Sequence, residues 1–120
     1  MNEGMLEKAK EVGRLLGQTD EYKALQRARQ AINEDRETVE LVNRLSELEG
    51  TMTSLLQQGN QPDEEMQKEY EQTFSTLQSG SRYQALVAAQ SNFDKILQRV
   101  NQEIGAGMES GAQSSIIYPG

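Results

Sequence analysis

The stretch Arg36–Gln58, RETVELVNRLSELEGTMTSLLQQ, decides the fold of this chain. Its leucines recur at alternating steps of three and four residues, the spacing that keeps one side of a helix against a partner helix. The resulting seam consists of Thr38, Leu41, Leu45, Leu48, Met52 and Leu55, and it is widened on one flank by Val42 and Leu56. A helix of this length spans roughly 33 Å, too long for a small globular core to surround. We therefore expect it to pack lengthwise against other helices.

The residues that follow this stretch predict a tight turn into a second long helix. Gly59 can adopt the left-handed conformation that ends a helix, and Pro62 suits the first turn of the next helix because it has no amide hydrogen to leave unpaired. The helix expected over 63–77 repeats the heptad spacing with Met66, Tyr70, Thr73 and Leu77, and Phe74 lies alongside. Because a loop this short makes two helices antiparallel neighbours, the pattern predicts a helical hairpin. We expect the last helix or another subunit to pack on the widened flank of the first seam.

Two shorter helices are expected before the hairpin, over 2–16 and 21–33. Thr19 or Asp20 can cap the second of them, and Asp35 is placed to cap the long helix, because short polar side chains accept hydrogen bonds from free amides at helix starts. The first helix carries an apolar stripe made of Met5, Ala9, Val12 and Leu16, broadened by Leu6 and Leu15. Charged residues fill the rest of its surface, which indicates a solvated face.

A last helix is expected from the Ser81 cap to Ile104. Its seam consists of Tyr83, Leu86, Gln90, Phe93, Leu97, Val100 and Ile104. Gln90 is the polar member of this seam. It is either a buried amide that sets helix register or, as we favour, a partly exposed one. From Gly105 onward, glycines punctuate the sequence, so residues 105–120 are expected to form a flexible tail.

Together these patterns predict an all-α fold of about five helices, with a long antiparallel helical hairpin and shorter N-terminal helices. Residues 1–104 should form a single α-helical domain that assembles as an oligomeric helical bundle. Gly50 inside the long helix marks either a close approach of another helix or, as we favour, a tolerated surface glycine. The candidate helix-packing and oligomer seam comprises Leu41, Leu45, Leu48, Met52, Leu55, Met66, Tyr70, Phe74, Leu77, Leu86, Phe93, Leu97 and Val100.

The composition argues against several kinds of partner. The 120 residues carry a formal net charge of −7, so a nucleic-acid backbone would be repelled unless the basic residues clustered, and they form no stripe. No apolar run approaches the roughly 20 residues that cross a bilayer, and no leader-like segment follows Met1. We therefore expect a cytoplasmic protein that binds neither nucleic acid nor membrane directly.

The sequence also argues against catalysis and cofactors. It has no cysteine and no histidine, which removes thiolate nucleophiles, imidazole bases and the usual zinc and iron–sulfur ligands. Carboxylates at helical spacing could line one side of a metal site, but a solvated face is the stronger interpretation because charged residues stay outside unless paired. These carboxylates are Glu34, Glu37, Glu40, Glu65 and Glu69. We expect no enzyme, no bound metal and no cofactor.

Six short motifs in order resemble the YlbF/YmcA family of small bacterial helical proteins, including its YheA-like members. The resemblance covers nearly all of residues 5–104, and it rests on the order and spacing of the motifs more than on any one of them. The motifs are AKEVG at 9–13, DEYK at 20–23, NED at 33–35, LLQQG at 55–59, YQAL at 83–86 and AAQSNF at 88–93.

The resemblance implies an all-α protein that self-associates and has no catalytic activity of its own. The best-studied family members act in a cytoplasmic complex with a third protein, YaaT, that influences competence, sporulation, biofilm formation and the specificity of ribonuclease Y in mRNA processing. Those members have been associated with iron–sulfur clusters through cysteine ligands. This sequence departs from them because it has no cysteine, so cluster binding is not carried over.

Two functional hypotheses follow. The first is a cytoplasmic, oligomeric helical adaptor or regulatory protein that binds itself and another cytoplasmic protein through its helix faces. It is favoured because three apolar stripes in one small chain are more than a single hairpin covers. The second is a structural or holdase-like coiled-coil module that covers apolar segments of many chains.

Overall fold

The computed structural model describes residues 2–117, with side chains described as far as residue 113. This part of the chain is all-α and contains no strand, as the sequence predicts. Each expected helix is present, and all but the last end within one residue of the prediction. The helices are α1 (Glu3–Gly17), α2 (Asp20–Glu34), α3 (Arg36–Gln57), α4 (Glu64–Gln78) and α5 (Ser81–Ile117).

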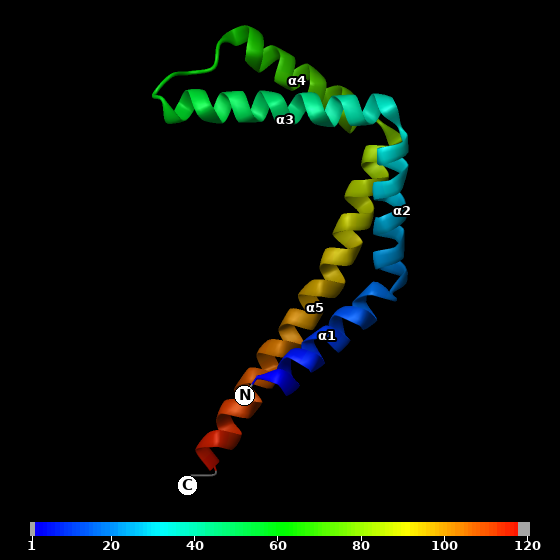
Figure 1. Ribbon diagram of the computed structural model, residues 1–120, viewed down its shortest axis with the longest axis vertical. Coiled ribbons are helices and arrows are strands. Elements are labelled where there is room, and N and C mark those ends of the chain that lie inside the picture. Colours follow the sequence, from blue (N-terminus) through cyan, green and yellow to red (C-terminus); the bar gives the residue numbers. More distant parts are fainter. Residues whose placement is uncertain (1, 118–120) are drawn as a thin grey trace.

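The five helices form two arms that meet at a corner (Figure 1). One arm is the antiparallel pair α3 and α4, which confirms the predicted hairpin. In the other arm α2 packs antiparallel on the first half of α5, and α1 runs on beside the second half. The radius of gyration is 21.5 Å, whereas a compact domain of this length has about 14 Å. Of the two partners expected on the widened flank of α3, the last helix is not the one found, because α5 packs mainly on α2. Packing of another subunit on that flank stays a prediction.

Side-chain caps fix where three of the helices begin. The oxygens of Thr19, Asp35 and Asp63 accept hydrogen bonds from the backbone amides three residues later, at 3.1, 3.3 and 2.8 Å. Gly59 has a φ of 81°, the left-handed conformation expected of it. The prediction for Pro62 was wrong, because the Asp63 cap starts α4 at Glu64 and leaves Pro62 in the loop.

The buried side chains form two small clusters, one in each arm. Leu45, Leu48 and Leu77 are buried between α3 and α4, and Leu25, Ile32 and Ala89 are buried between α2 and α5. Leu25 is the most enclosed, with 1% of its surface exposed. Neither cluster reaches α1, in which no residue is buried. Each buried cluster thus lies between two helices, and the outer faces of those helices are exposed to solvent.

The last helix is longer than the sequence indicated. We expected it to end at Ile104, but α5 continues through Gly105, Gly107 and Gly111 to Ile117. A glycine costs about 1 kcal/mol in a helix interior but does not block one, and the residues between these glycines include good helix formers. The flexibility of 105–120 and the domain boundary at 104 stay predictions, and residues 118–120 lie outside the described part.

Truncating a buried leucine of the hairpin should destabilise the protein strongly. Leu48 is 4% exposed, so Leu48→Ala is expected to lower the free energy of unfolding by about 2–5 kcal/mol, because it leaves a cavity between α3 and α4. The matched control is Leu56→Ala on the same helix, where the side chain is 58% exposed and the expected change is within about 0.5 kcal/mol. Urea titration followed by circular dichroism measures both. Equal losses would contradict the assignment of Leu48 to the core.

The cap at Asp35 should make stability depend on pH. The hydrogen bond from the Thr38 hydroxyl, aided by the nearby Arg82 guanidinium, holds the pKa of Asp35 below its ordinary value despite partial desolvation. A lowered folded-state pKa gives stabilisation that is complete above the unfolded pKa and is lost as pH falls through the folded one. Asp35→Ala should therefore lower the thermal midpoint at neutral pH, and the gap from wild type should narrow on acidification.

The control for this titration is Glu71→Ala, which removes an exposed carboxylate in the interior of α4 that caps no helix. Thermal midpoints of wild type, Asp35→Ala and Glu71→Ala across the acidic range show whether the Asp35 charge contributes to stability. A gap between wild type and Asp35→Ala that stays constant from neutral to acid pH would show that the Asp35 charge contributes nothing to folding.

Candidate interaction surface

The predicted seam residues of α3 and α4 face one another inside the hairpin arm. Leu45, Leu48 and Leu77 are buried, as described above. The others are half-buried, namely Leu41, Met52, Leu55, Met66, Tyr70 and Phe74. Tyr70 and Phe74 stack along α4 with ring centroids 6.2 Å apart. This part of the candidate seam therefore packs within one chain.

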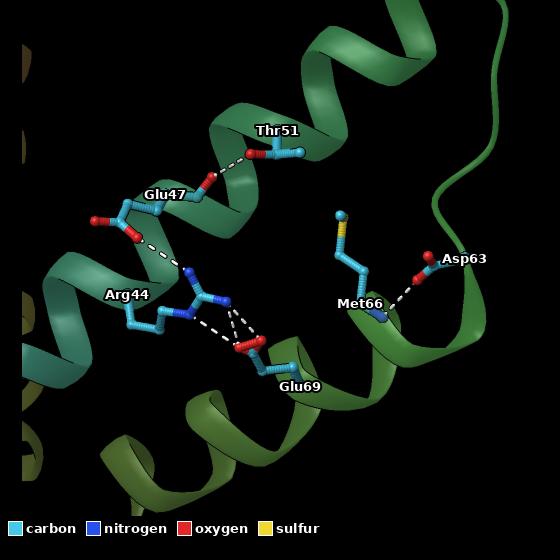
Figure 2. Close-up of polar contacts among 6 residues, drawn as sticks. All are labelled: Arg44, Glu47, Thr51, Asp63, Met66 and Glu69. Carbon is cyan, nitrogen blue, oxygen red and sulfur yellow. Dashed lines mark hydrogen bonds and ion pairs between the residues drawn. The ribbon is translucent and has the colours of Figure 1, made fainter.

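A polar clamp at the edge of this seam joins α3 to α4 (Figure 2). The Arg44 guanidinium donates to both carboxylate oxygens of Glu69 at 2.6 to 2.9 Å and to Glu47 at 3.0 Å, and these contacts, Glu69 first, raise the pKa of Arg44. Nearby, the Tyr70 hydroxyl donates to Glu49 at 3.0 Å, which raises the pKa of Tyr70. The charged side chains of the Arg44 clamp are substantially exposed, so its ion pairs contribute little to stability.

The predicted seam residues of α5 lie mainly against α2. Leu86, Phe93 and Val100 are half-buried, and the Phe93 ring lies 5.3 Å from that of Tyr22 in α2. Gln90 is partly exposed, as we favoured, and it accepts from Arg29 at 3.5 Å and donates to Asp94 at 2.9 Å. Gly50 has no atom within 4 Å of a hypothetical Cβ, so it is a surface glycine.

Much apolar surface stays uncovered in the single chain. Among the side chains that the structure describes, ten large hydrophobic ones are exposed, and eight of these belong to α1 or α5. Those on α1 are Met5, Leu6, Val12 and Leu15, and those on α5 are Val87, Leu97, Ile104 and Met108. Of these eight, the candidate seam contained Leu97 alone. The α1 stripe was visible at helical spacing, but the sequence could not show that no other helix of the chain covers it.

An apolar groove runs between α1 and the second half of α5. Its floor and walls are formed by Val12 of α1 and by Ile96, Val100 and Ile104 of α5. Arg99 and Glu103 complete the lining. The helices that line it, α1 and the second half of α5, belong to the arm that points away from the hairpin (Figure 1). It is shallow and open to solvent.

The charge of the chain is segregated between the arms. Residues 36–78, which form the hairpin arm, contain nine acidic and three basic residues and so carry −6 of the net −7. The α1 and α5 helices each contain three acidic and three basic residues. Most of the acidic surface and most of the exposed large hydrophobic side chains therefore lie on different arms.

The carboxylates considered as metal ligands do not form a site. Glu34, Glu37, Glu40 and Glu65 are exposed, and Glu69 is paired with Arg44. Across residues 2–117, no three or more Asp or Glu side chains come close enough together to hold a metal ion. Among the described helices, none combines the length and apolarity needed to cross a membrane.

Several bacterial proteins are similar to this chain in sequence. The chain is similar to UPF0342 proteins of Staphylococcus saprophyticus (30% identical, covering 80% of this chain and 84% of the relative) and of Leuconostoc mesenteroides (26%, covering 84% and 86%). A UPF0342 protein of Leuconostoc citreum is 24% identical, and the match covers 84% of this chain and 86% of the relative.

A family model described as "Control of competence regulator ComK, YlbF/YmcA" matches residues 5–109. The match includes all of α1 to α4 from Met5 onward, and it continues past Gly105 into the part of α5 that the sequence analysis had assigned to a tail. The resemblance seen in the six short motifs is thereby confirmed. The chain belongs to the YlbF/YmcA family.

Proposed function

We propose that this protein is a non-catalytic helical adaptor or regulatory protein, which self-associates and presents helix faces to a cytoplasmic protein partner. The observation that carries the proposal is the amount of surface left open. The chain exposes 9461 Å², whereas a compact protein of 13.4 kDa exposes about 6,500 Å². Large apolar patches on a soluble chain mark sites of protein association.

The family description supports a regulatory role for this association. It names control of the competence regulator ComK, and the resemblance to YlbF and YmcA extends the proposed role to competence, sporulation and ribonuclease Y-dependent RNA processing. In this protein such a role would depend on helix packing alone, because the chain has no cysteine to ligate an iron–sulfur cluster.

A holdase-like module is the alternative, and the α1–α5 groove is the observation that favours it. Its lining is mostly apolar and carries one acidic and one basic side chain. Such a groove could receive an apolar segment of almost any unfolded chain. The two functions differ in selectivity: an adaptor binds one or two partners at fixed stoichiometry, whereas a holdase binds many clients.

The solution mass tests self-association. At micromolar concentration we expect at least twice the 13.4 kDa of one chain, because association removes the exposed apolar side chains from water. Sedimentation equilibrium is the suitable measurement, because the elongated shape distorts elution volumes. A chain that remains monomeric up to about 100 µM, a concentration far above the dissociation constants of stable complexes, would contradict the proposal.

Co-purification at native abundance separates the two functions. A tagged chain should retain one or two proteins at stoichiometric amounts if it is an adaptor. The control is the same capture after a brief heat shock, which enlarges the pool of unfolded proteins. Recovery of a broad set of proteins that grows with heat shock would exclude the adaptor function and favour the holdase.

A further inference from the structure

We propose that α1 is a hinged strap, which closes onto the second half of α5 and occupies the apolar groove that stands open between these two helices. The strap goes beyond the function proposed above, because it is a movement within one chain and depends on neither self-association nor a partner protein. A closed strap withdraws the groove from other apolar segments, so α1 controls access to it.

The helix α1 lacks the burial that a short helix needs. None of its 15 residues is buried, and an isolated helix of about 12–15 residues is only marginally stable in water. Most of the stability of a helix in a protein comes from packing its apolar face against another element. The α5 wall of the groove lies beside α1 and offers such a surface, so α1 becomes more stable when it closes.

The two helices diverge from the end at which α1 joins α2. On α1, Leu16 beside this link is half-buried, Val12 is 37% exposed and Met5 is 61% exposed. On α5, Val100 is half-buried and Ile104 is 52% exposed. Exposure therefore rises along both helices with distance from the link, as expected of two apolar stripes that face each other but are splayed apart.

The two stripes match in register when the helices run antiparallel, as they do in Figure 1. Val12 and Val100 both line the groove and define the pair. Seven residues, or about two helical turns, further from the link, Met5 lies opposite Gly107. A Cβ placed on Gly107 would have no atom within 4 Å, so this position leaves room for the Met5 side chain.

The link between α1 and α2 anchors one end of the strap and provides the hinge. The Thr19 hydroxyl donates to the Leu16 carbonyl at 2.7 Å and accepts from the Tyr22 amide at 3.1 Å, so it joins the end of α1 to the start of α2. Gly17, the last residue of α1, has nothing within 4 Å of a hypothetical Cβ. A small rotation at the link therefore brings the N-terminal half of α1 onto α5 without a clash at the pivot.

Covalent attachment selects α1 as the occupant of the groove. Two residues separate α1 from α2, and a segment on so short a link meets its target at an effective concentration of the order of millimolar. Closing covers Met5, Val12 and Ile104, whereas Leu6 and Leu15 lie to either side of the α1 stripe and stay exposed. The strap and the proposed self-association therefore use different side chains and can fail separately.

Hydrogen exchange tests the closed strap. The amides of α1 should be protected in the wild-type chain, and Val12→Asp should raise their exchange rate at least about tenfold, because a carboxylate is costly in an apolar contact without a partner. The matched control is Lys10→Asp, which places the same residue on the opposite face of α1 and should change the rate little. Protection in the wild type should be equal at low and high chain concentration.

Three results of this experiment would overturn the strap. They are exchange of wild-type α1 at the rate of an unstructured peptide, equal acceleration by Val12→Asp and Lys10→Asp, and protection that grows with chain concentration.

An engineered disulfide tests where α1 lies, because the chain has no cysteine of its own. The double variant Met5→Cys, Gly107→Cys should form an intramolecular disulfide when treated with oxidised glutathione, since two cysteines bridge only when their Cα atoms come within about 7 Å. In the control pair, Glu7→Cys with Gly107→Cys, position 7 faces away from the stripe, and the reaction should be at least about tenfold slower. Intact mass and non-reducing gels identify the products. Disulfide-linked dimers, equal rates in the two pairs or no disulfide would overturn the strap, the first in favour of a second copy.

The locked double variant also shows whether the strap occupies the groove. The dye ANS binds exposed apolar surface, so its fluorescence should be lower with the oxidised chain than with the same chain after reduction. Equal fluorescence of the two forms would overturn the control of groove access by α1.

Discussion

The corner at Asp35 is the constraint on which the rest of the architecture depends. There the chain passes from α2 to α3. The Asp35 carboxylate accepts hydrogen bonds from the Thr38 amide and hydroxyl, and it lies 3.8 Å from the Arg82 guanidinium at the start of α5. The return passage from α4 to α5, at Gly80, lines the same pocket as Asp35. Both connections turn at this corner, and the two helix pairs leave it in different directions (Figure 1), so each pair has its own buried cluster.

Two separate helix pairs bury less than one bundle of the same length would. Leu45, Leu48 and Leu77 serve one arm, and Leu25, Ile32 and Ala89 serve the other, so the hydrophobic contribution to folding is small for a chain of this size. Because the core is small, many apolar side chains of α1 and α5 stay exposed. The apolar side chains that stay exposed on these two helices are the ones that the self-association proposed above would cover.

Sequence reasoning recovered the local features of this fold because they depend on neighbouring residues. The seam of α3, the caps at Thr19 and Asp35, and the turn at Gly59 follow from side-chain period and backbone chemistry. The cap at Asp63 was not predicted, because Pro62 was expected in the first turn of that helix. The pairing of α5 with α2 did not follow, because similar stripes on several helices leave their partners undetermined. For the same reason the candidate seam named residues that pack within the chain and omitted Val12, Ile104 and Met108, whose exposure only the tertiary structure shows.

Because α5 is one unbroken helix, it fixes the distances between the parts of the molecule that lie along it. At about 1.5 Å per residue, its 37 residues make a rod of roughly 55 Å that runs from the corner to the far end of the molecule. The hairpin arm and the α1–α5 groove lie along one continuous helix, so the distance between them is determined by helix length and not by a flexible linker.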